Sequence, residues 1–132
     1  MERRDGIDRP NEDAFAAFSK RAADGPVFML NLLEFRPDGG AERYAEYGAA
    51  VAPLLARAGG NPIFAGRPAE SLIGEGSWDL MVLVSYPTRQ AFLDMVSSPE
   101  YQAIEHLRTE SLVRSELRAM DAVDTGALGD QS

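Results

Sequence analysis

Two segments of the chain are apolar at almost every position over the length of a β-strand. The first, residues 27–35, reads Val-Phe-Met-Leu-Asn-Leu-Leu-Glu-Phe, and the second, residues 78–86, reads Trp-Asp-Leu-Met-Val-Leu-Val-Ser-Tyr. Successive side chains of a strand point to opposite faces of the sheet, so a strand that is apolar at odd and even positions needs a cover on both faces. The pattern predicts two central strands of one sheet.

Apolar residues recur at helical spacing in three other stretches. Residues 11–23 predict a short N-terminal helix, and residues 41–58 predict a long helix in which Pro53 should kink or divide the last turn. Residues 88–112 predict a helical crossover in two parts, with a second start at Ser98. Side chains that suit the N-cap position open three of these helical pieces, namely Asn11, Thr88 and Ser98.

Two weaker strands complete the pattern. Residues 61–73 contain two prolines, which cannot donate to a ladder and therefore indicate a sheet edge, and residues 115–123 are mixed in polarity. After the N-terminal helix the order is strand, helix, strand, strand, helix, strand. This order predicts an α+β, ferredoxin-like βαββαβ fold with a four-stranded antiparallel sheet and both long helical segments on one face.

The same reading divides the chain into four parts. We expect a flexible N-terminal arm at 1–10, a helical extension at 11–24, a ferredoxin-like domain at 25–123 and a flexible C-terminal tail at 124–132. The helices of this fold cover one face of the sheet and leave the apolar residues of the other face bare. A second copy of the chain is the expected cover, while the alternative is that the N-terminal helix or the tail closes that face.

Composition narrows the function classes. The formal net charge is -8 and the sequence pI is about 4.6, which opposes general binding to nucleic acid or anionic membranes. The chain has no Cys, no run near the ~20 apolar residues of a membrane helix, and no apolar stretch typical of a secretory signal. We therefore expect a cytoplasmic protein with no thiolate metal site, no other metal-ligand pattern and no cofactor.

Several short pieces of the sequence together resemble one protein family. The chain is similar to the DUF1330 family of the dimeric α/β-barrel superfamily over about residues 25–120. The pieces that carry the resemblance are Val27 to Phe35, Tyr44 with Tyr47, Val51 to Leu54, Gly59-Gly60, Trp78-Asp79, Tyr86 to Arg89 and Ser98 to Gln102.

The resemblance implies a ferredoxin-like subunit whose sheet joins that of a second subunit in a barrel, with a small-molecule pocket in each subunit. It implies no reaction, since the family is named for an unknown function. Other members of the superfamily include cofactor-independent monooxygenases, lactone isomerases and haem enzymes, but their activities would transfer by fold analogy alone. Glu34 departs from the basic residue that is common there in the family.

Asn31 is the first candidate for a functional side chain. A polar amide among apolar neighbours must have its hydrogen-bonding groups paired, so Asn31 either ties the strand to a helix or presents its amide to a ligand.

Trp78 and Asp79 begin the second central strand. There Asp79 could transfer protons beside an aromatic surface, or Trp78 could fill the core while Asp79 caps a turn.

The helices add further candidates. Tyr44 and Tyr47 are one turn apart, so both can face the sheet with their hydroxyls at the rim of a pocket or simply pack in the core. Arg108 borders an apolar stripe and could anchor an anionic ligand. His106, the only histidine, lies two positions away and cannot share that face, so we expect it to be exposed.

These residues favour a homodimer that binds a compact organic ligand between the helices and the sheet. Asn31, Tyr44, Tyr47, Trp78, Asp79 and Arg108 are the candidate binding residues. Such a pocket could serve a cofactor-independent enzyme that catalyses proton transfer or oxygenation. The alternative is a non-catalytic module for ligand sensing or protein interaction.

Overall fold

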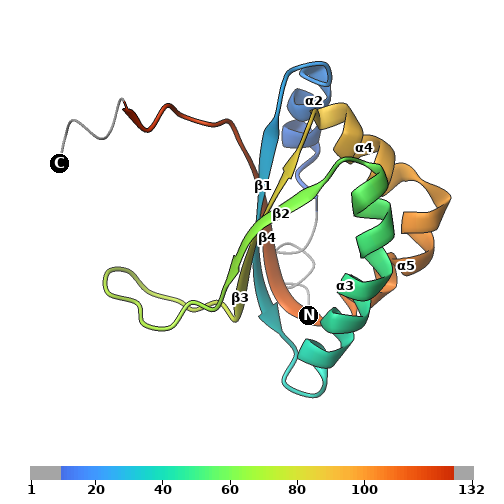
Figure 1. Cartoon of the computed structure of the whole chain (residues 1–132). Coiled ribbons are helices and arrows are strands. Elements are labelled where there is room, and N and C mark those ends of the chain that lie inside the picture. Colours follow the sequence, from blue (N-terminus) through green and yellow to red (C-terminus); the bar gives the residue numbers. More distant parts are fainter. Residues whose placement is uncertain (1–9, 127–132) are drawn as a thin grey trace.

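The computed structural model describes residues 10–126 as an antiparallel sheet with helices packed on it (Figure 1). The elements follow the predicted order. They are α2 (Glu12–Lys20), β1 (Val27–Phe35), α3 (Gly40–Arg57), β2 (Asn61–Gly66), β3 (Leu80–Tyr86), α4 (Arg89–Ser97), α5 (Pro99–Thr109) and β4 (Leu112–Met120).

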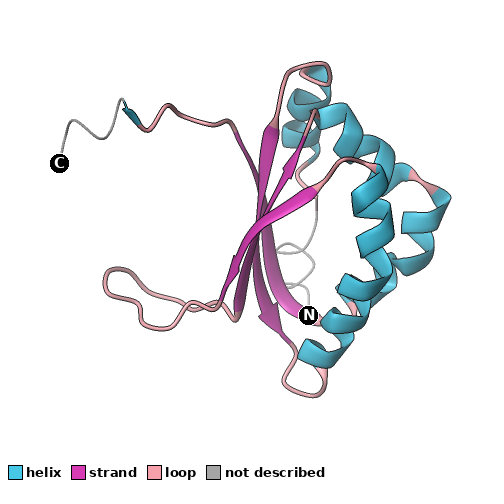
Figure 2. Ribbon diagram, viewed as in Figure 1, coloured by secondary structure: helices cyan, strands magenta, loops and turns pink. Residues whose placement is uncertain are grey.

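The sheet has the strand order β2-β3-β1-β4, and every neighbouring pair is antiparallel. The two strongly apolar strands, β1 and β3, occupy the centre, and the proline-bearing and mixed strands form the edges. Figure 2 shows the long helices gathered on one side of the sheet. The ferredoxin-like prediction is confirmed.

The strand ends differ from the predicted ones. β2 stops at Gly66, and residues 67–79 form a long loop before β3 begins at Leu80. β4 begins at Leu112, three residues earlier than predicted, because α5 ends at Thr109 and the chain turns at once. That turn is held by Ser111, which is fully buried and whose hydroxyl donates to the Arg108 carbonyl at 2.7 Å.

Pro53 does not divide the helix, since α3 continues through it to Arg57. A proline removes the backbone donor that would bond the carbonyl four residues earlier. Ala49 occupies that earlier position, and both it and Pro53 are exposed. The carbonyl can therefore bond to water, and the helix tolerates the proline.

The start of α3 depends on two glycines. Gly39 has a φ of 93°, in the left-handed region that favours glycine. At Gly40 a Cβ atom would lie 2.5 Å from the carbonyl oxygen of Ser111. The first turn of α3 can therefore lie directly against the turn that leads into β4.

The core lies between the sheet and the long helices. Val27, Met29 and Leu33 of β1 point into it and are at most 4% exposed. Buried side chains of the other elements pack around Val27 and Met29, namely Tyr47, Val51, Leu54, Val84, Tyr86, Phe92, Met95 and Tyr101. One face of β1 is thus covered within the chain.

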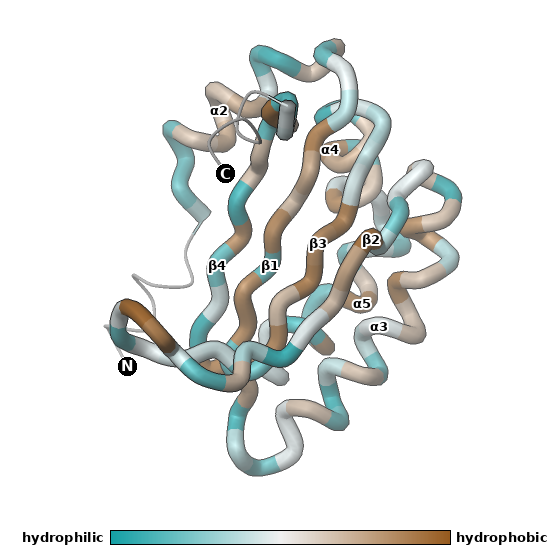
Figure 3. The backbone as a smooth tube through the Cα atoms, turned by 60° about the vertical axis from the view of Figure 1, so that its left-hand side comes forward, coloured by the Kyte–Doolittle hydropathy of each residue, from teal (hydrophilic) through white to brown (hydrophobic). Residues whose placement is uncertain are grey.

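The opposite face of the sheet, called here the outer face, is apolar at its centre. Leu30 of β1 pairs with Leu83 of β3, and Leu32 pairs with Met81. Figure 3 shows β1 and β3 as the most hydrophobic strands. Within the described residues, α2 packs on the helical layer and the segment after β4 extends away from the sheet (Figure 1), so neither covers the outer face.

α2 is attached to the rest of the molecule by an aromatic contact and by ion pairs. Phe18 packs edge-on against Phe92 of α4, with ring centroids 5.7 Å apart. At the end of the helix, Arg21 donates to both carboxylate oxygens of Asp121 at 2.9 and 3.0 Å. Arg89 donates to Asp121 at 3.1 Å, so one carboxylate joins α2, α4 and the end of β4.

The predicted N-terminal arm and C-terminal tail fall almost wholly outside the described residues, because residues 1–9 and 127–132 are not described. The predicted helical extension at 11–24 contains α2. In the described part of the chain, none of the helices has both the length and the apolar character needed to cross a lipid bilayer.

Replacing Asp121 with Asn is expected to loosen α2. A helix of nine residues is marginal without tertiary contacts, so amide exchange across α2 should speed up several-fold at neutral pH. The hydrogen bonds from Arg21 and then from Arg89 lower the pKa of Asp121. Its stabilising effect is therefore present above the unfolded pKa and is lost as the pH falls through the lower folded pKa.

The effect of Asp121→Asn should accordingly fade in acid. Hydrogen exchange followed by mass spectrometry at several pH values measures it, with Asp38→Asn in an exposed loop as the control. Equal exchange of α2 in the variant and the wild type at neutral pH would show that Asp121 does not hold the helix.

Candidate functional site

Asn31 lies in the middle of β1 and faces the helices. Its backbone is paired between Val82 of β3 and Leu117 of β4. The side-chain amide donates to the carbonyl of Val82 at 3.4 Å, and its oxygen accepts from Nη2 of Arg108 at 3.4 Å. Both contacts are long for hydrogen bonds. Asn31 therefore bridges the sheet and α5 through weak contacts.

Arg108 is half-buried near the end of α5, and within residues 10–126 no carboxylate pairs with it. Its hydrogen bond to Asn31 uses one of the five N–H donors of a guanidinium group. A cation taken partly out of water gains from an anionic partner, and a planar guanidinium group fits a carboxylate well. The site therefore has the charge and the donors to receive an anion.

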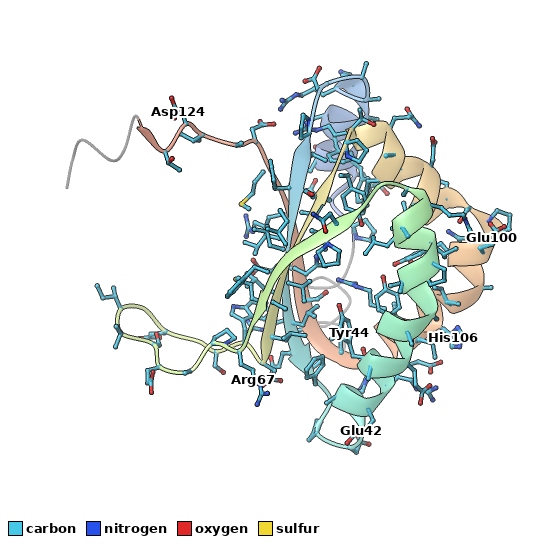
Figure 4. All side chains as sticks on the ribbon, in the orientation of Figure 1. Glu42, Tyr44, Arg67, Glu100, His106 and Asp124 are labelled. Atoms are coloured by element: carbon cyan, nitrogen blue, oxygen red, sulfur yellow. The ribbon has the colours of Figure 1, made fainter. Side chains whose placement is uncertain are left out.

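Three tyrosines from the two long helices lie beside this pair and form what we call the tyrosine layer: Tyr44, Tyr47 and Tyr101. The rings of Tyr44 and Tyr47 are 5.4 Å apart, and Tyr44 is also 5.4 Å from Phe35 of β1. The hydroxyls of Tyr47 and Tyr101 share a buried hydrogen bond of 2.9 Å, which joins α3 to α5. Figure 4 shows Tyr44 between α3 and the sheet.

Burial shifts the pKa of two members of the tyrosine layer, Tyr44 and Tyr47. It raises the pKa of Tyr44 and of Tyr47, and the nearby positive charge of Arg108 lowers each pKa in part. Burial also raises the pKa of Tyr86, which lies beneath the layer. These phenols are neutral at physiological pH, so they can donate hydrogen bonds but cannot act as tyrosinate bases.

Trp78 and Asp79 do not belong to this constellation. Trp78 is half-buried beneath Arg114 of β4, whose guanidinium carbon lies 3.8 Å from the ring centroid. Asp79 is exposed, and its carboxylate accepts from the backbone N–H of Phe35 at 2.8 Å. Its own N–H donates to the carbonyl of Leu33 at 2.8 Å. Both residues hold the entry to β3 against neighbouring strands.

The remaining polar candidates carry no visible chemistry. His106 is exposed and points away from the sheet on α5 (Figure 4). Over residues 10–126, no group of three or more His, Cys, Asp or Glu side chains could hold a metal ion. The structure thus brings together four of the predicted site residues, which are Asn31, Tyr44, Tyr47 and Arg108.

Two surface hollows lie elsewhere. One of about 640 Å³ lies where α2 ends and includes Arg21, Phe28 and Asp121 in its wall. Another of about 410 Å³ lies between α3 and the α4–α5 junction, beside Leu54 and Met95. None of the six predicted site residues lines either hollow. Access to Arg108 therefore depends on the partly exposed surface around it.

Sequence reasoning missed Tyr101 and Arg89. Tyr101 begins the apolar stripe of α5, so the sequence could predict that it lies on a buried face. The sequence could not predict its hydrogen bond to Tyr47. Arg89 is 3% exposed, and its Nε and Nη1 atoms have no hydrogen-bond partner in the described structure. An arginine in the first turn of a helix is normally exposed, but here the ring of Phe18 lies over Arg89, 5.2 Å from its guanidinium carbon.

The Tyr47–Tyr101 bond predicts non-additive effects of two substitutions. Tyr47→Phe and Tyr101→Phe should each lower the free energy of unfolding by about 1 kcal/mol, because each leaves the other hydroxyl buried without its partner. The double variant should lose less than the sum. Denaturant unfolding measures the cycle, and Tyr44→Phe serves as the single-site control. Additive losses would contradict a direct coupling of the two hydroxyls.

Known structures share this architecture. A protein of unknown function from Rhodopseudomonas palustris is 32% identical, with a TM-score of 0.82 over 89% of this chain and 97% of that one. A dimeric ferredoxin-like protein of unknown function from Jannaschia is 16% identical, with a TM-score of 0.63 over 74% of this chain and 100% of that one.

A dimeric protein of unknown function and ferredoxin-like fold from Bacteroides fragilis is 14% identical. Its TM-score is 0.56 over 75% of this chain and 98% of that one. At these lower identities the likeness concerns the fold alone. No curated protein matches the sequence significantly.

The family model for the domain of unknown function DUF1330 matches residues 39–122. The matched span begins at α3 and includes the helices and strands that follow, whereas the sequence resemblance extended back to β1. Together with the Rhodopseudomonas protein, which is similar over nearly the whole chain, this match establishes the family. The chain belongs to the DUF1330 family.

Proposed function

We propose that this protein is a homodimer in which each subunit binds a small anionic organic molecule at Arg108, with Asn31 and Tyr44 as further contacts. A carboxylate or an enolate is the chemical group that fits best. The observation that carries the proposal is the half-buried Arg108 guanidinium, which has a long bond to an amide and no carboxylate partner within residues 10–126.

The donors around Arg108 support an anion over a neutral or cationic ligand. Arg108 offers a full positive charge, and the neutral phenol of Tyr44 has no hydrogen-bond partner among the described residues. The contact between Arg108 and Asn31 is 3.4 Å long, so a carboxylate gains a charge-assisted bond at little cost to the existing one. The aromatic rings of Tyr44 and Phe35 would contact the apolar part of the ligand.

The same groups define which reactions the site could support. Arg108, Asn31 and a neutral phenol stabilise negative charge that develops on oxygen, as in an enolate. Tyr44 and Tyr47 cannot take a proton as bases, because burial keeps them neutral. An enzyme built on this site would therefore rely on a base from the substrate or solvent and on stabilisation of the anion.

A non-catalytic sensing role is the second candidate function. The buried bond between Tyr47 and Tyr101 and the close ring contacts fill much of the space between α3, α5 and β1. A ligand that binds at the rim without being turned over fits this tight packing. Binding is common to both roles, so it is tested first.

The proposed dimer is supported by the outer face. Its centre is apolar, and its β4 side carries ion pairs, including Arg114 with Glu34 and Arg118 with Glu116. An apolar centre with a charged rim is the usual make-up of a protein interface. Fold neighbours from Jannaschia and Bacteroides fragilis are described as dimeric.

Replacing Arg108 with Ala should weaken binding of simple carboxylates. With benzoate as the probe, titration calorimetry or ligand-observed NMR should show a dissociation constant at least about tenfold higher than in the wild type, since one charge-assisted bond is worth roughly 1.5–3 kcal/mol. Arg57→Ala, on the exposed side of α3, is the matched control and should bind like the wild type.

Equal benzoate binding by the Arg108→Ala variant would overturn the assignment of the site. So would a wild type that binds neither benzoate nor short aliphatic carboxylates at millimolar concentration. Asn31→Ala is expected to have a smaller effect than Arg108→Ala, because its contribution is a neutral hydrogen bond.

Replacing Leu30 with Asp should break the dimer. Light scattering of the wild type at micromolar concentration is expected to give about twice the 14.3 kDa chain mass, and Leu30→Asp should give one chain mass while keeping its circular dichroism spectrum. Leu117→Asp, at a 42% exposed position of β4 on the helical side, is the control and should remain dimeric. A monomeric wild type would contradict the covered outer face.

A further inference from the structure

The loop between β2 and β3, residues 67–79, exposes two large aliphatic side chains at its far end. We call this loop the arm from here on; it is distinct from the N-terminal arm predicted at residues 1–10. Leu72 is 90% exposed and Ile73 is 97% exposed, more than any other large apolar side chain of the described structure. Single exposed apolar residues are ordinary on protein surfaces. Two adjacent ones at the end of a projecting loop form a contact surface that residues 10–126 leave uncovered.

The tip of the arm has a defined turn. Gly74 and Gly76 have φ values of 102° and 87°, which favour glycine, and Ser71 donates its hydroxyl to the carbonyl of Gly74 at 2.7 Å. These features fold the chain back immediately after Leu72 and Ile73. The turn therefore presents the two aliphatic side chains at the outermost point of the arm.

The base of the arm is fixed to the sheet. Arg114 of β4 donates to the carbonyl of Ser77 at 2.8 Å and covers the ring of Trp78. The same arginine pairs with Glu34 of β1 at 3.1 Å. Asp79 bonds the end of β1 through its backbone and its carboxylate. Two of the residues predicted for a pocket thus set the direction in which the arm leaves the sheet.

The arm leaves on the side of the outer face. Figure 1 shows it extending away from the helices, with the segment after β4 extending to the same side from the other end of the sheet. In Figure 3 the end of the arm is strongly hydrophobic, as are the central strands β1 and β3. A body seated on the outer face would therefore meet the arm.

We propose that the arm clasps a second copy of this chain, with Leu72 and Ile73 packed against the partner subunit. The inference rests on the proposed homodimer and adds to it a contact outside the sheets. In a two-fold dimer each subunit gives one arm and receives one, so a single sequence feature is used twice. The contact extends an interface that is centred on Leu30 and its neighbours.

Charge favours a protein partner over a lipid surface. Glu70 and Glu75 flank the aliphatic pair, so an anionic bilayer would repel the tip. The outer face is apolar at its centre and has charged residues along β4, which is the surface a second copy would present to the arm.

The first test removes the aliphatic surface without adding charge. The double variant Leu72→Ser, Ile73→Ser should raise the dimer dissociation constant at least about tenfold in sedimentation equilibrium. Ala69→Ser changes the same arm without removing a large side chain and should match the wild type. Because the tip is exposed in the single chain, the double variant should keep its thermal unfolding profile under conditions where the protein is monomeric.

The second test uses the absence of Cys from the sequence. A Glu75→Cys variant is labelled with an environment-sensitive fluorophore, which places the probe beside the tip without removing its aliphatic side chains. Emission should shift to the red on dilution below the dimer dissociation constant, as the probe leaves the partner subunit. An Arg57→Cys label on the helical layer should show no shift.

The outcomes separate the two proposals. A wild type that is dimeric, with an unchanged dissociation constant in the double variant and no emission shift, overturns the arm contact and leaves the dimer intact. A wild type that is monomeric at high micromolar concentration overturns both. Binding of the labelled tip to phosphatidylcholine vesicles in place of the partner would also overturn the arm contact.

Discussion

The structure depends on one strand that must be covered twice. β1 is apolar on both faces, and a fold with one helical layer can cover only one of them. On the helical side Val27, Met29 and Leu33 are removed from water completely or nearly so, while Leu30 and Leu32 remain half-buried on the outer face. Removing apolar surface from water is the dominant favourable term in folding and association. The incomplete cover is therefore the physical reason to expect a second subunit.

The covered side of β1 contains one polar exception, and that exception locates the candidate site. Burying an amide is costly unless it is bonded, and Asn31 meets this requirement through Val82 and Arg108. Arg108 in turn is half-buried without a carboxylate partner among the described residues. A site that served only stability would be better served by apolar side chains, since a poorly paired charge opposes folding. The proposed ligand site rests on this polar pair.

Much of this fold could be predicted from the sequence. The spacing of the apolar residues distinguished strands from helices, and the strongly apolar character of β1 and β3 placed them at the centre of the sheet. Alternation also placed Asn31 on the same face as Met29 and Leu33. It could not say which face the helices cover, since that depends on the handedness of the crossovers acting on the whole chain. The burial of Arg89 had no local signal, because α2 covers it from a distant part of the sequence.

Trp78 and Asp79 show that residue type alone does not distinguish a structural contact from a chemical one. An aromatic ring next to a carboxylate suggested chemistry, yet the pair holds the base of a loop on the outer side of the sheet. Asp79 bonds the end of β1, and the same strand, β1, carries Asn31. Because β1 belongs to both faces, a shift of the strand when a partner packs on it would change the 3.4 Å contact between Asn31 and Arg108. In the proposed dimer, a partner on the outer face and a ligand at Arg108 would therefore both act on β1.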